Sequence, residues 1–311
     1  MRIVFAGTPE FAVPSLRALA ADPDHELVGV ITRADAPIGR KRVLTPSPVA
    51  QLADELGVPT LKTNRLDDAA TQWVADRAPD LGVIVAYGGL VREPLLTLPR
   101  LGWVNLHFSE LPRWRGAAPV QRALEAGEQR LGMTVFRLEA ELDAGDVLTM
   151  AHHEFAPGTS AGEALTLLAD AGTKPLRDAV RLLAQDSEAG DAQEGEVTFA
   201  AKLTREDGRL DLAQPAAAVL AHWAGVTPEP GAYVMLDEQP VKLHEVRSPQ
   251  AKLAQPVSVT EPLGTVTAHQ GAVLLHLSDG PLELVRVQPA GKPAMVAADW
   301  LRGRGGRVVL S

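Results

Sequence analysis

Short apolar runs alternate with helix-like stretches throughout the first half of the chain. Residues 2–6 form the first apolar run, which ends at Gly7-Thr8-Pro9, and residues 11–21 then carry apolar side chains at helical spacing. Strands buried on both faces read as continuous apolar runs, so this alternation predicts a parallel sheet covered by helices on both sides. We therefore predict a doubly wound, Rossmann-like α/β domain. Its other predicted strands lie at 26–32, within 56–62, and at 81–86, 103–106 and 133–138, and its other helices at 49–56, 69–78 and 163–183.

The composition changes after the last of these helices. Residues 186–196 are acidic, small and glycine-containing, which is typical of a linker. Beyond them we predict a helix at 215–224 and five short strands, at 232–235, 241–246, 264–267, 272–277 and 282–287. Short strands at this spacing indicate a small antiparallel, OB-like β-barrel. We therefore expect an α/β domain over 1–185, a linker over 186–204 and a barrel domain over 205–311.

Charge and composition exclude several classes of protein. The chain has 311 residues, a formal charge of −9 and no cysteine. It therefore lacks disulfides, thiolate metal ligands and thiol nucleophiles, and any nucleic acid must be held by local basic patches. The longest apolar run, 81–91, is too short to span a bilayer, and Thr8-Pro9-Glu10 interrupts the N-terminal run before a signal peptide can form. We expect a cytoplasmic protein that does not associate with membranes.

Familiar catalytic signatures are missing or have another explanation. The sequence contains no G-x-G-x-x-G, no P-loop and no H-E-x-x-H, which disfavours nicotinamide enzymes, P-loop NTPases and zinc proteases. Residues 158–162 match the G-x-S-x-G pattern of serine hydrolases. Ser160 followed by Glu163 is also a helix capping box, and we favour that interpretation. A hydrolase that uses Ser160 remains the alternative.

The densest polar cluster begins at residue 105. Asn105 and His107 are two residues apart at the end of a predicted strand, so their side chains point to the same side. In open α/β sheets, ligands bind at the carboxyl ends of the strands. Alone, such a pair is as often structural as catalytic. Asp143, on a glycine-containing loop after the next strand, can reach His107 and thereby favours catalysis.

Seven short motifs run through nearly the whole chain. They are F-A-G-T-P-E-F-A at 5–12, Gly39-Arg40 with T-P-S-P at 45–48, V-A-Y-G at 85–88, N-x-H at 105–107, R-G-A-A-P at 115–119, L-D-x-G-D at 142–146 and Q-P-A-G-K at 288–292. Through these motifs the chain resembles the 10-formyltetrahydrofolate-dependent formyltransferases, and among them the methionyl-tRNA formyltransferases. The sequence departs from their usual pattern at Phe108, Glu110 and residues 227–231.

This resemblance implies transfer of a formyl group from 10-formyltetrahydrofolate to the α-amine of methionyl-initiator-tRNA. Asn105, His107 and Asp143 would be catalytic: Asn105 donates to the developing oxyanion, His107 donates to it as well or carries the amine proton, and Asp143 fixes the His107 tautomer and stabilises its protonated form. The folate would be a cosubstrate, with no tightly bound cofactor, metal or covalent intermediate. Implied folate contacts are Tyr87, Gly88, Ser109, Glu110, Leu111 and Pro112, and implied tRNA contacts are Arg40, Lys41, Arg42 and Lys202.

The acidic total charge leaves local basic groups to hold the tRNA. The resemblance places Arg40 near the acceptor end, and Arg302, Arg304 and Arg307 are plausible phosphate contacts on the barrel. We expect a monomer. A second alternative to an enzyme is a non-catalytic tRNA-binding module. Within the formyltransferases, a sugar nucleotide or glycinamide ribonucleotide is the alternative acceptor.

Overall fold

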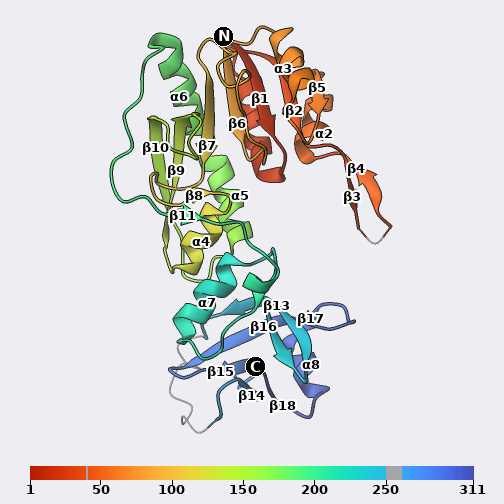
Figure 1. Ribbon diagram of the computed structural model, residues 1–311. Helices are drawn as coiled ribbons and strands as arrows, with labels where there is room; N and C mark the ends of the chain where they lie inside the picture. Colours follow the sequence, from red (N-terminus) through yellow and green to blue (C-terminus); the bar gives the residue numbers. More distant parts are fainter. Residues whose placement is uncertain (40, 250–260) are drawn as a thin grey trace. The chain divides into compact units, whose positions relative to one another are not determined.

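The computed structural model describes residues 1–39, 41–249 and 261–311 (Figure 1). These residues form two compact units. The first contains Met1–Pro119, Leu131–His153 and Leu165–Ala200, and the second contains Val120–Arg130, Glu154–Ala164 and Ala201–Ser311. The linker over 186–204 stays a prediction.

A mixed seven-stranded sheet forms the centre of the first unit. Its strands stand in the order β10 (Val147–Glu154), β9 (Arg130–Arg137), β7 (Trp103–His107), β6 (Leu81–Val85), β1 (Arg2–Gly7), β2 (Glu26–Thr32) and β5 (Thr60–Lys62). The pairs from β7 through β5 are parallel, as predicted.

The expectation of a purely parallel sheet is wrong at β9, which runs antiparallel to β7. Between the two strands lies α4 (Pro119–Glu125), which has only 7 residues. A parallel crossover returns the chain to the start of the neighbouring strand. Here the chain re-enters the sheet beside the end of β7, where His107 pairs with Thr134 of β9. Sequence analysis also missed β10 and the hairpin of β3 (Ala36–Ile38) and β4 (Val43–Thr45).

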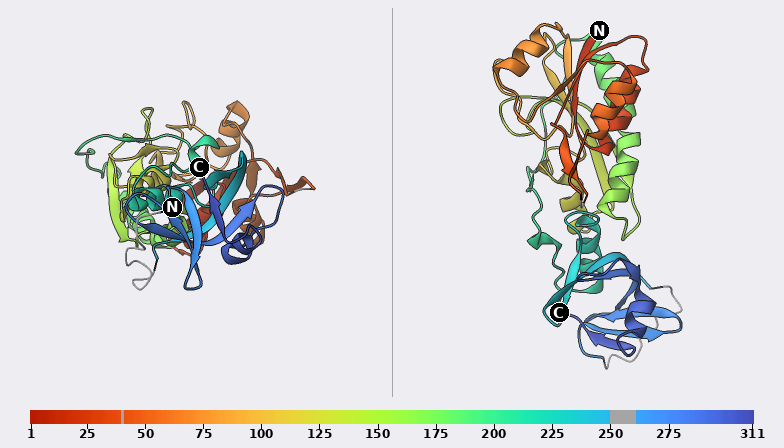
Figure 2. Two further views of the ribbon diagram at one scale, coloured as in Figure 1. Left: turned by 90° about the horizontal axis from the view of Figure 1, so that it is seen from below. Right: turned by 90° about the vertical axis from the view of Figure 1, so that its right-hand side faces the viewer.

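Helices cover both faces of this sheet, which confirms the doubly wound prediction (Figure 2). On one side, α1 (Val13–Ala20) contacts α2 (Pro48–Glu55) and α6 (Thr173–Gln185). On the other, α3 (Asp68–Ala75) buries Val74 against Val4, Ala6 and Trp103. The predicted helix at 163–183 is two helices, because α5 (Ala161–Ala171) ends before Gly172 and α6 begins after it.

An antiparallel sheet forms the centre of the second unit. Backbone hydrogen bonds of 2.7 and 2.9 Å join Met235 near one end of the sheet to Ser311 near the other, which gives the predicted barrel. The strand order is β12 (Tyr233–Leu236), β13 (Gln239–Arg247), β16 (Pro281–Pro289), β15 (Ala272–His276), β14 (Thr265–His269) and β18 (Arg307–Val309), with β17 (Met295–Val296) beside β16.

The interior of this barrel is apolar, and two tryptophans pack into it. Trp223 comes from α7 (Ala216–Gly225), and Trp300 comes from α8 (Ala297–Arg302). The indole N–H of Trp223 donates to the Leu243 carbonyl at 2.8 Å, which satisfies its polar atom. The predicted helix at 215–224 is α7, and Pro215 stands just before it as its N-cap. Across the described residues, no helix has the length and apolar character needed to cross a membrane.

Candidate active site

The end of β7 holds two of the three predicted catalytic residues. His107 is its last residue, and Asn105 lies two positions earlier. Asp143 comes from the loop between β9 and β10, and its Oδ2 lies 4.0 Å from Nδ1 of His107. The structure thus brings His107 and Asp143 together as predicted. Asn105 is half-buried, and its amide makes no hydrogen bond within the described part of the chain, so it can serve a ligand.

The state of His107 follows from its surroundings. Its side chain is buried, and Nε2 lies 2.9 Å from the Trp114 carbonyl. A carbonyl only accepts, so Nε2 carries the hydrogen and Nδ1 of the neutral ring has the free lone pair. Burial holds the pKa of His107 below its ordinary 6.5, against opposing effects of the Asp143 charge and the Trp114 hydrogen bond. His107 is therefore a neutral base whose Nδ1 faces Asp143.

This geometry corrects one detail of the expected catalytic group. The resemblance implied that Asp143 fixes the His107 tautomer, whereas the Trp114 carbonyl does so. At 4.0 Å the carboxylate is too far from Nδ1 for a hydrogen bond. Its charge nevertheless favours a protonated imidazole. The Asp143 carboxylate therefore lies where it would stabilise a proton on Nδ1 of His107.

Asp143 is itself held by the backbone that follows β7. Its Oδ2 accepts a 2.8 Å hydrogen bond from the Gly116 N–H. Gly116 lies in β8 (Arg115–Gly116), which pairs with β11 (Phe199–Ala200). A Cβ at Gly116 would lie 2.7 Å from the Ala200 carbonyl oxygen, and its φ is +126°. Only glycine fits there, so the R-G sequence places the N–H that orients Asp143.

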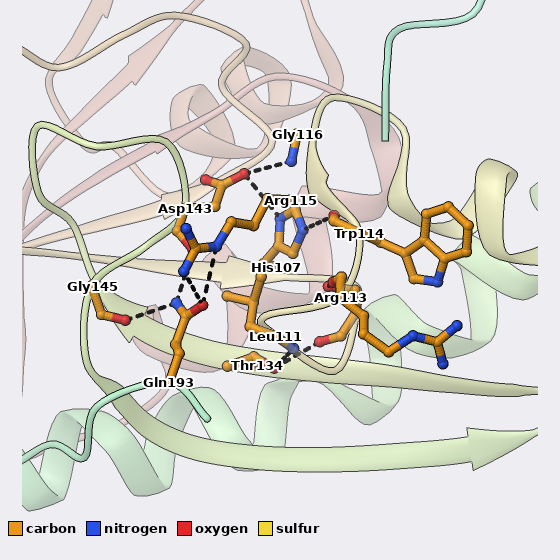
Figure 3. A network of polar contacts seen from close by, with 11 residues as sticks. His107, Leu111, Arg113, Trp114, Arg115, Gly116, Thr134, Asp143, Gly145 and Gln193 are labelled. Carbon is orange, nitrogen blue, oxygen red and sulfur yellow. Dashed lines mark hydrogen bonds and ion pairs between the residues drawn. The ribbon is translucent and has the colours of Figure 1, made fainter. Parts of the chain in front are cut away.

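Sequence reasoning missed two polar side chains beside this group. Arg115 is buried and forms an ion pair with Glu141 at 3.2 Å. It also donates to Gln193, whose amide reaches the loop that carries Asp143 (Figure 3). Arg115 stood inside a recognised motif, but its partner Gln193 lies 78 positions away in a segment of linker composition. No local signal in the sequence marks such a contact.

The first predicted folate segment follows β6. Tyr87 has its ring buried in the core at 1% exposure, and its hydroxyl donates to the Thr63 carbonyl at 2.8 Å. Burial raises the pKa of this phenol. The Arg33 guanidinium donates to the carbonyls of Tyr87 and Gly88. The Tyr87 side chain therefore belongs to the core of the first unit and stabilises the fold.

The second predicted folate segment, Ser109 to Pro112, follows β7 and is held by hydrogen bonds to side chains. The Ser109 hydroxyl donates to the Arg113 carbonyl at 2.7 Å. Thr134 of β9 donates to the Ser109 carbonyl and accepts from the Leu111 N–H, at 2.6 and 3.2 Å. Glu110 is partly exposed, with His152 3.9 Å away. Because β6 and β7 are adjacent and parallel, both folate segments lie at one edge of the sheet.

The predicted tRNA contacts are partly described. Arg40 lies outside the described residues. Lys41 and Arg42 are exposed in the turn between β3 and β4, and Lys202 is exposed after β11.

The basic residues of the barrel differ in their surroundings. Arg302 forms an ion pair with Asp299 at 3.1 Å, and Arg307 forms one with Glu261 at 2.9 Å. Arg304 is exposed and makes no ion pair with a residue that the structure describes. Its guanidinium is therefore more accessible to a ligand than those of Arg302 and Arg307, which form ion pairs.

The capping interpretation of Ser160 is confirmed. Its hydroxyl lies 2.7 Å from Glu163 Oε2, and the same carboxylate accepts from the Ser160 N–H at 2.9 Å. The Glu163 N–H in turn donates to the hydroxyl at 3.3 Å. This is the reciprocal arrangement of a capping box at the start of α5. The hydroxyl is occupied by a carboxylate, not by a histidine base.

Two family models match this chain in sequence order. The model described as "Formyl transferase" matches residues 1–180, and "Formyl transferase, C-terminal domain" matches residues 202–305. A protein named methionyl-tRNA formyltransferase from Leifsonia xyli subsp. xyli (strain CTCB07) is 54% identical over 311 residues, which cover 100% of both chains.

Solved structures share the fold at low sequence identity. HypX from Aquifex aeolicus, in complex with tetrahydrofolic acid, has a TM-score of 0.62 and 16% identity over 97% of this chain and 47% of its own. WlaRD, described as a sugar 3N-formyl transferase, has a TM-score of 0.66 and 12% identity over 94% of this chain and 99% of its own. With both family models matched and a full-length relative at 54% identity, this chain belongs to the formyl transferase family.

Proposed function

We propose that this chain transfers the formyl group of 10-formyltetrahydrofolate to the α-amino group of methionyl-initiator-tRNA. The observation that carries the proposal is the 54% identity, over its whole length, to a protein named methionyl-tRNA formyltransferase. Asn105 and His107 at the end of β7 support the proposal, because ligands bind at the carboxyl edges of such sheets. HypX, which shares the fold, binds tetrahydrofolic acid, and this supports a folate donor.

The proposed reaction exchanges one amide bond for another. The amine nitrogen attacks the formyl carbon, and negative charge develops on the formyl oxygen. When the carbonyl re-forms, the bond to N10 of the folate breaks. The amine loses one proton in forming the amide, and N10 of the departing tetrahydrofolate gains one. The site must therefore stabilise an oxyanion and move a proton.

Asn105 suits the first of these tasks. Its amide is half-buried and makes no hydrogen bond within the described residues, so it can donate to the developing oxyanion. Removal of one such donor typically lowers the rate by about 10²–10³. Asn105 and His107 lie on the same side of β7, so the hydrogen-bond donor and the base can act on the same substrate.

His107 and Asp143 suit the second task. Burial keeps the imidazole neutral, and the Trp114 carbonyl holds the hydrogen on Nε2, so Nδ1 is ready to accept the amine proton. Asp143, 4.0 Å from Nδ1, then offsets the new positive charge. The proton is returned to N10 as the folate leaves. We propose no covalent intermediate and no metal in these steps.

We propose that local basic groups bind the tRNA: Arg40, Lys41 and Arg42 near the acceptor end, and Lys202 and the barrel arginines on the backbone. Folate contacts would come from the backbone of Tyr87 and Gly88 and from Ser109, Glu110, Leu111 and Pro112. The acceptor is made where translation takes place, which favours the cytoplasm. A monomer suffices for the proposed site.

A direct comparison of acceptors tests this proposal. The purified chain is incubated with 10-formyltetrahydrofolate and, separately, methionyl-initiator-tRNA, glycinamide ribonucleotide or an amino-sugar nucleotide. We expect formylmethionyl-tRNA as the main product, and its loss in Asn105→Ala. Binding of the tRNA without turnover would instead support a non-catalytic binding module. Formylation of another acceptor alone would assign the chain a different substrate.

A further inference from the structure

Gln193 lies in a segment whose composition predicts only a linker, yet its side chain makes four hydrogen bonds in the active site (Figure 3). The amide nitrogen donates to the carbonyls of Asp143 and Gly145, at 2.8 and 2.9 Å. The amide oxygen accepts from Nη2 and Nε of Arg115, at 2.8 and 3.2 Å. Gln193 therefore joins the loop before β10 to the segment after β7.

The chemistry of these partners fixes the orientation of the amide. Backbone carbonyls only accept and a guanidinium only donates, so the nitrogen must face the loop and the oxygen must face Arg115. Glutamate would place an oxygen against two carbonyl oxygens, and a lysine would place a cation against Arg115. Position 193 therefore requires a neutral side chain that donates two hydrogen bonds and accepts two, and glutamine has the length to make all four.

The loop that Gln193 holds adopts a conformation needing such support. Asp143 has a φ of +48°, in the left-handed region that residues other than glycine adopt uncommonly, although aspartate does so more readily than most. Conformations of this kind persist where several contacts determine them. Gly116 fixes the Asp143 side chain, and Gln193 fixes its carbonyl.

The surrounding segment is anchored at neighbouring points. Asp191 and Val147 exchange backbone hydrogen bonds of 2.7 and 3.0 Å. The Thr198 hydroxyl accepts from the Trp114 N–H at 2.9 Å, and its carbonyl accepts from the Arg115 N–H at 2.9 Å. Trp114 is the residue whose carbonyl holds His107. The segment over 191–200 thus supports both members of the His107–Asp143 pair.

We propose that Gln193 is a positioning residue for formyl transfer: it holds the Asp143 loop so that the carboxylate faces His107, without itself touching the reactants. The inference rests on the proposed function, since it concerns the rate of that reaction. It assigns to a segment of linker composition a part in the catalytic geometry.

Two variants of Gln193 and one neighbouring control test this role. Gln193→Ala removes all four bonds, whereas Gln193→Glu keeps the shape and the contact with Arg115 but loses both donors. We expect each to lower kcat by about 10²-fold, as small displacements of a catalytic group do. KM for both substrates should stay unchanged. Glu194→Ala, at the exposed neighbouring position, should behave like wild type.

A double-mutant cycle with Asp143→Ala separates positioning from general loss of stability. If Gln193 acts through Asp143, then Gln193→Ala should cost little more once Asp143 is gone. Thermal unfolding and tetrahydrofolate binding check that each variant is folded, and Gln193→Glu carries the test if Gln193→Ala does not fold. Wild-type kcat in Gln193→Glu, or fully additive losses in the cycle, would overturn the inference. An inactive wild type would instead reject the proposed function.

Discussion

Two opposing effects set the charge of His107. Burial disfavours the imidazolium, while the nearby Asp143 carboxylate favours it. Burial is the larger effect, so the resting ring is neutral and can accept a proton. The Asp143 charge would therefore act mainly on the protonated ring. Because this charge raises the pKa of His107, the pKa reports the interaction between the two side chains.

Replacing Asp143 by asparagine should lower the pKa of His107 further. The carboxylate raises this pKa, so its removal leaves the burial effect less opposed, and the acid limb of kcat/KM should move to lower pH while kcat falls. NMR titration of the imidazole ring protons measures the pKa directly. Glu141→Gln, which removes a charge paired with Arg115, is the matched control and should leave the pKa of His107 unchanged. An upward shift in Asp143→Asn would contradict this assignment.

The site residues differ in how far the sequence predicted them. The sequence predicts Asn105 and His107 because strand geometry places alternate residues on one side. It predicts Asp143 because a glycine-containing loop follows the next strand. Gln193 was missed because its contacts span about 50 to 78 positions and nothing local marks them. The Tyr87 motif was recognised, but only the structure shows that its ring belongs to the core.

Single elements are fixed by local contacts that can be tested for stability. Ser160→Ala removes the hydroxyl that caps α5, and we expect a loss of about 1 kcal/mol in the free energy of unfolding. Glu163→Gln should cost less, since glutamine also completes a capping box. Chemical denaturation measures both. Formyl transfer per folded molecule should be unchanged, and a fluorophosphonate should not label Ser160. Covalent labelling would restore the hydrolase alternative.

In the short 3₁₀ helix at Glu206–Gly208, Asp207 links stability of the second unit to pH. Hydrogen bonds from the Thr204 hydroxyl and N–H, together with Arg122, lower the pKa of Asp207 from 3.8 to about 2. The stabilisation is therefore complete above pH 3.8 and is lost as pH falls toward 2. We expect Asp207→Ala to cost about 1–2 kcal/mol at neutral pH, after allowance for solvent exposure. Urea unfolding of the wild type and of Asp207→Ala at neutral pH and near pH 2 measures this cost. An equal cost at the two pH values would contradict the prediction.

At the level of elements, strand positions were easier to predict than strand directions. The apolar run at 133–138 marks a strand because burial on both faces leaves a continuous signal. Its direction depends on where the connecting chain re-enters the sheet, which periodicity does not indicate, and β9 runs antiparallel to β7. The hairpin of β3 and β4 was missed because its residues are largely exposed and lack the alternation of a buried strand.

Across the whole molecule, a net charge of −9 must be reconciled with a tRNA substrate. Basic residues at chosen points can do this, because phosphate contacts act locally. Arg40 is assigned by resemblance to recognition at the acceptor end. Arg304 is exposed on the second unit and suits a contact with the backbone. The two residues should therefore differ in their effect on tRNA selection.

Arg40→Lys should lower kcat/KM on methionyl-initiator-tRNA although it keeps the charge. A guanidinium stacks on a base or binds a phosphate through two donors, and an ammonium does neither. Arg304→Ala should weaken binding of every tRNA alike and reduce the salt slope by about one. Kinetics on initiator and elongator methionyl-tRNAs across a salt series distinguish the two. Wild-type behaviour of Arg40→Lys at every salt concentration would exclude the loop as a specificity element.

The central claim is that Asn105, His107 and Asp143 act as one unit on the formyl group and the amine. Single-turnover formylation of methionyl-initiator-tRNA by the three alanine variants and the triple variant tests it most directly. We predict that each single variant loses most of the rate, that tRNA binding changes little, and that the triple variant falls far short of the summed losses. Near-normal turnover in Asp143→Ala, or strictly additive losses, would contradict the account.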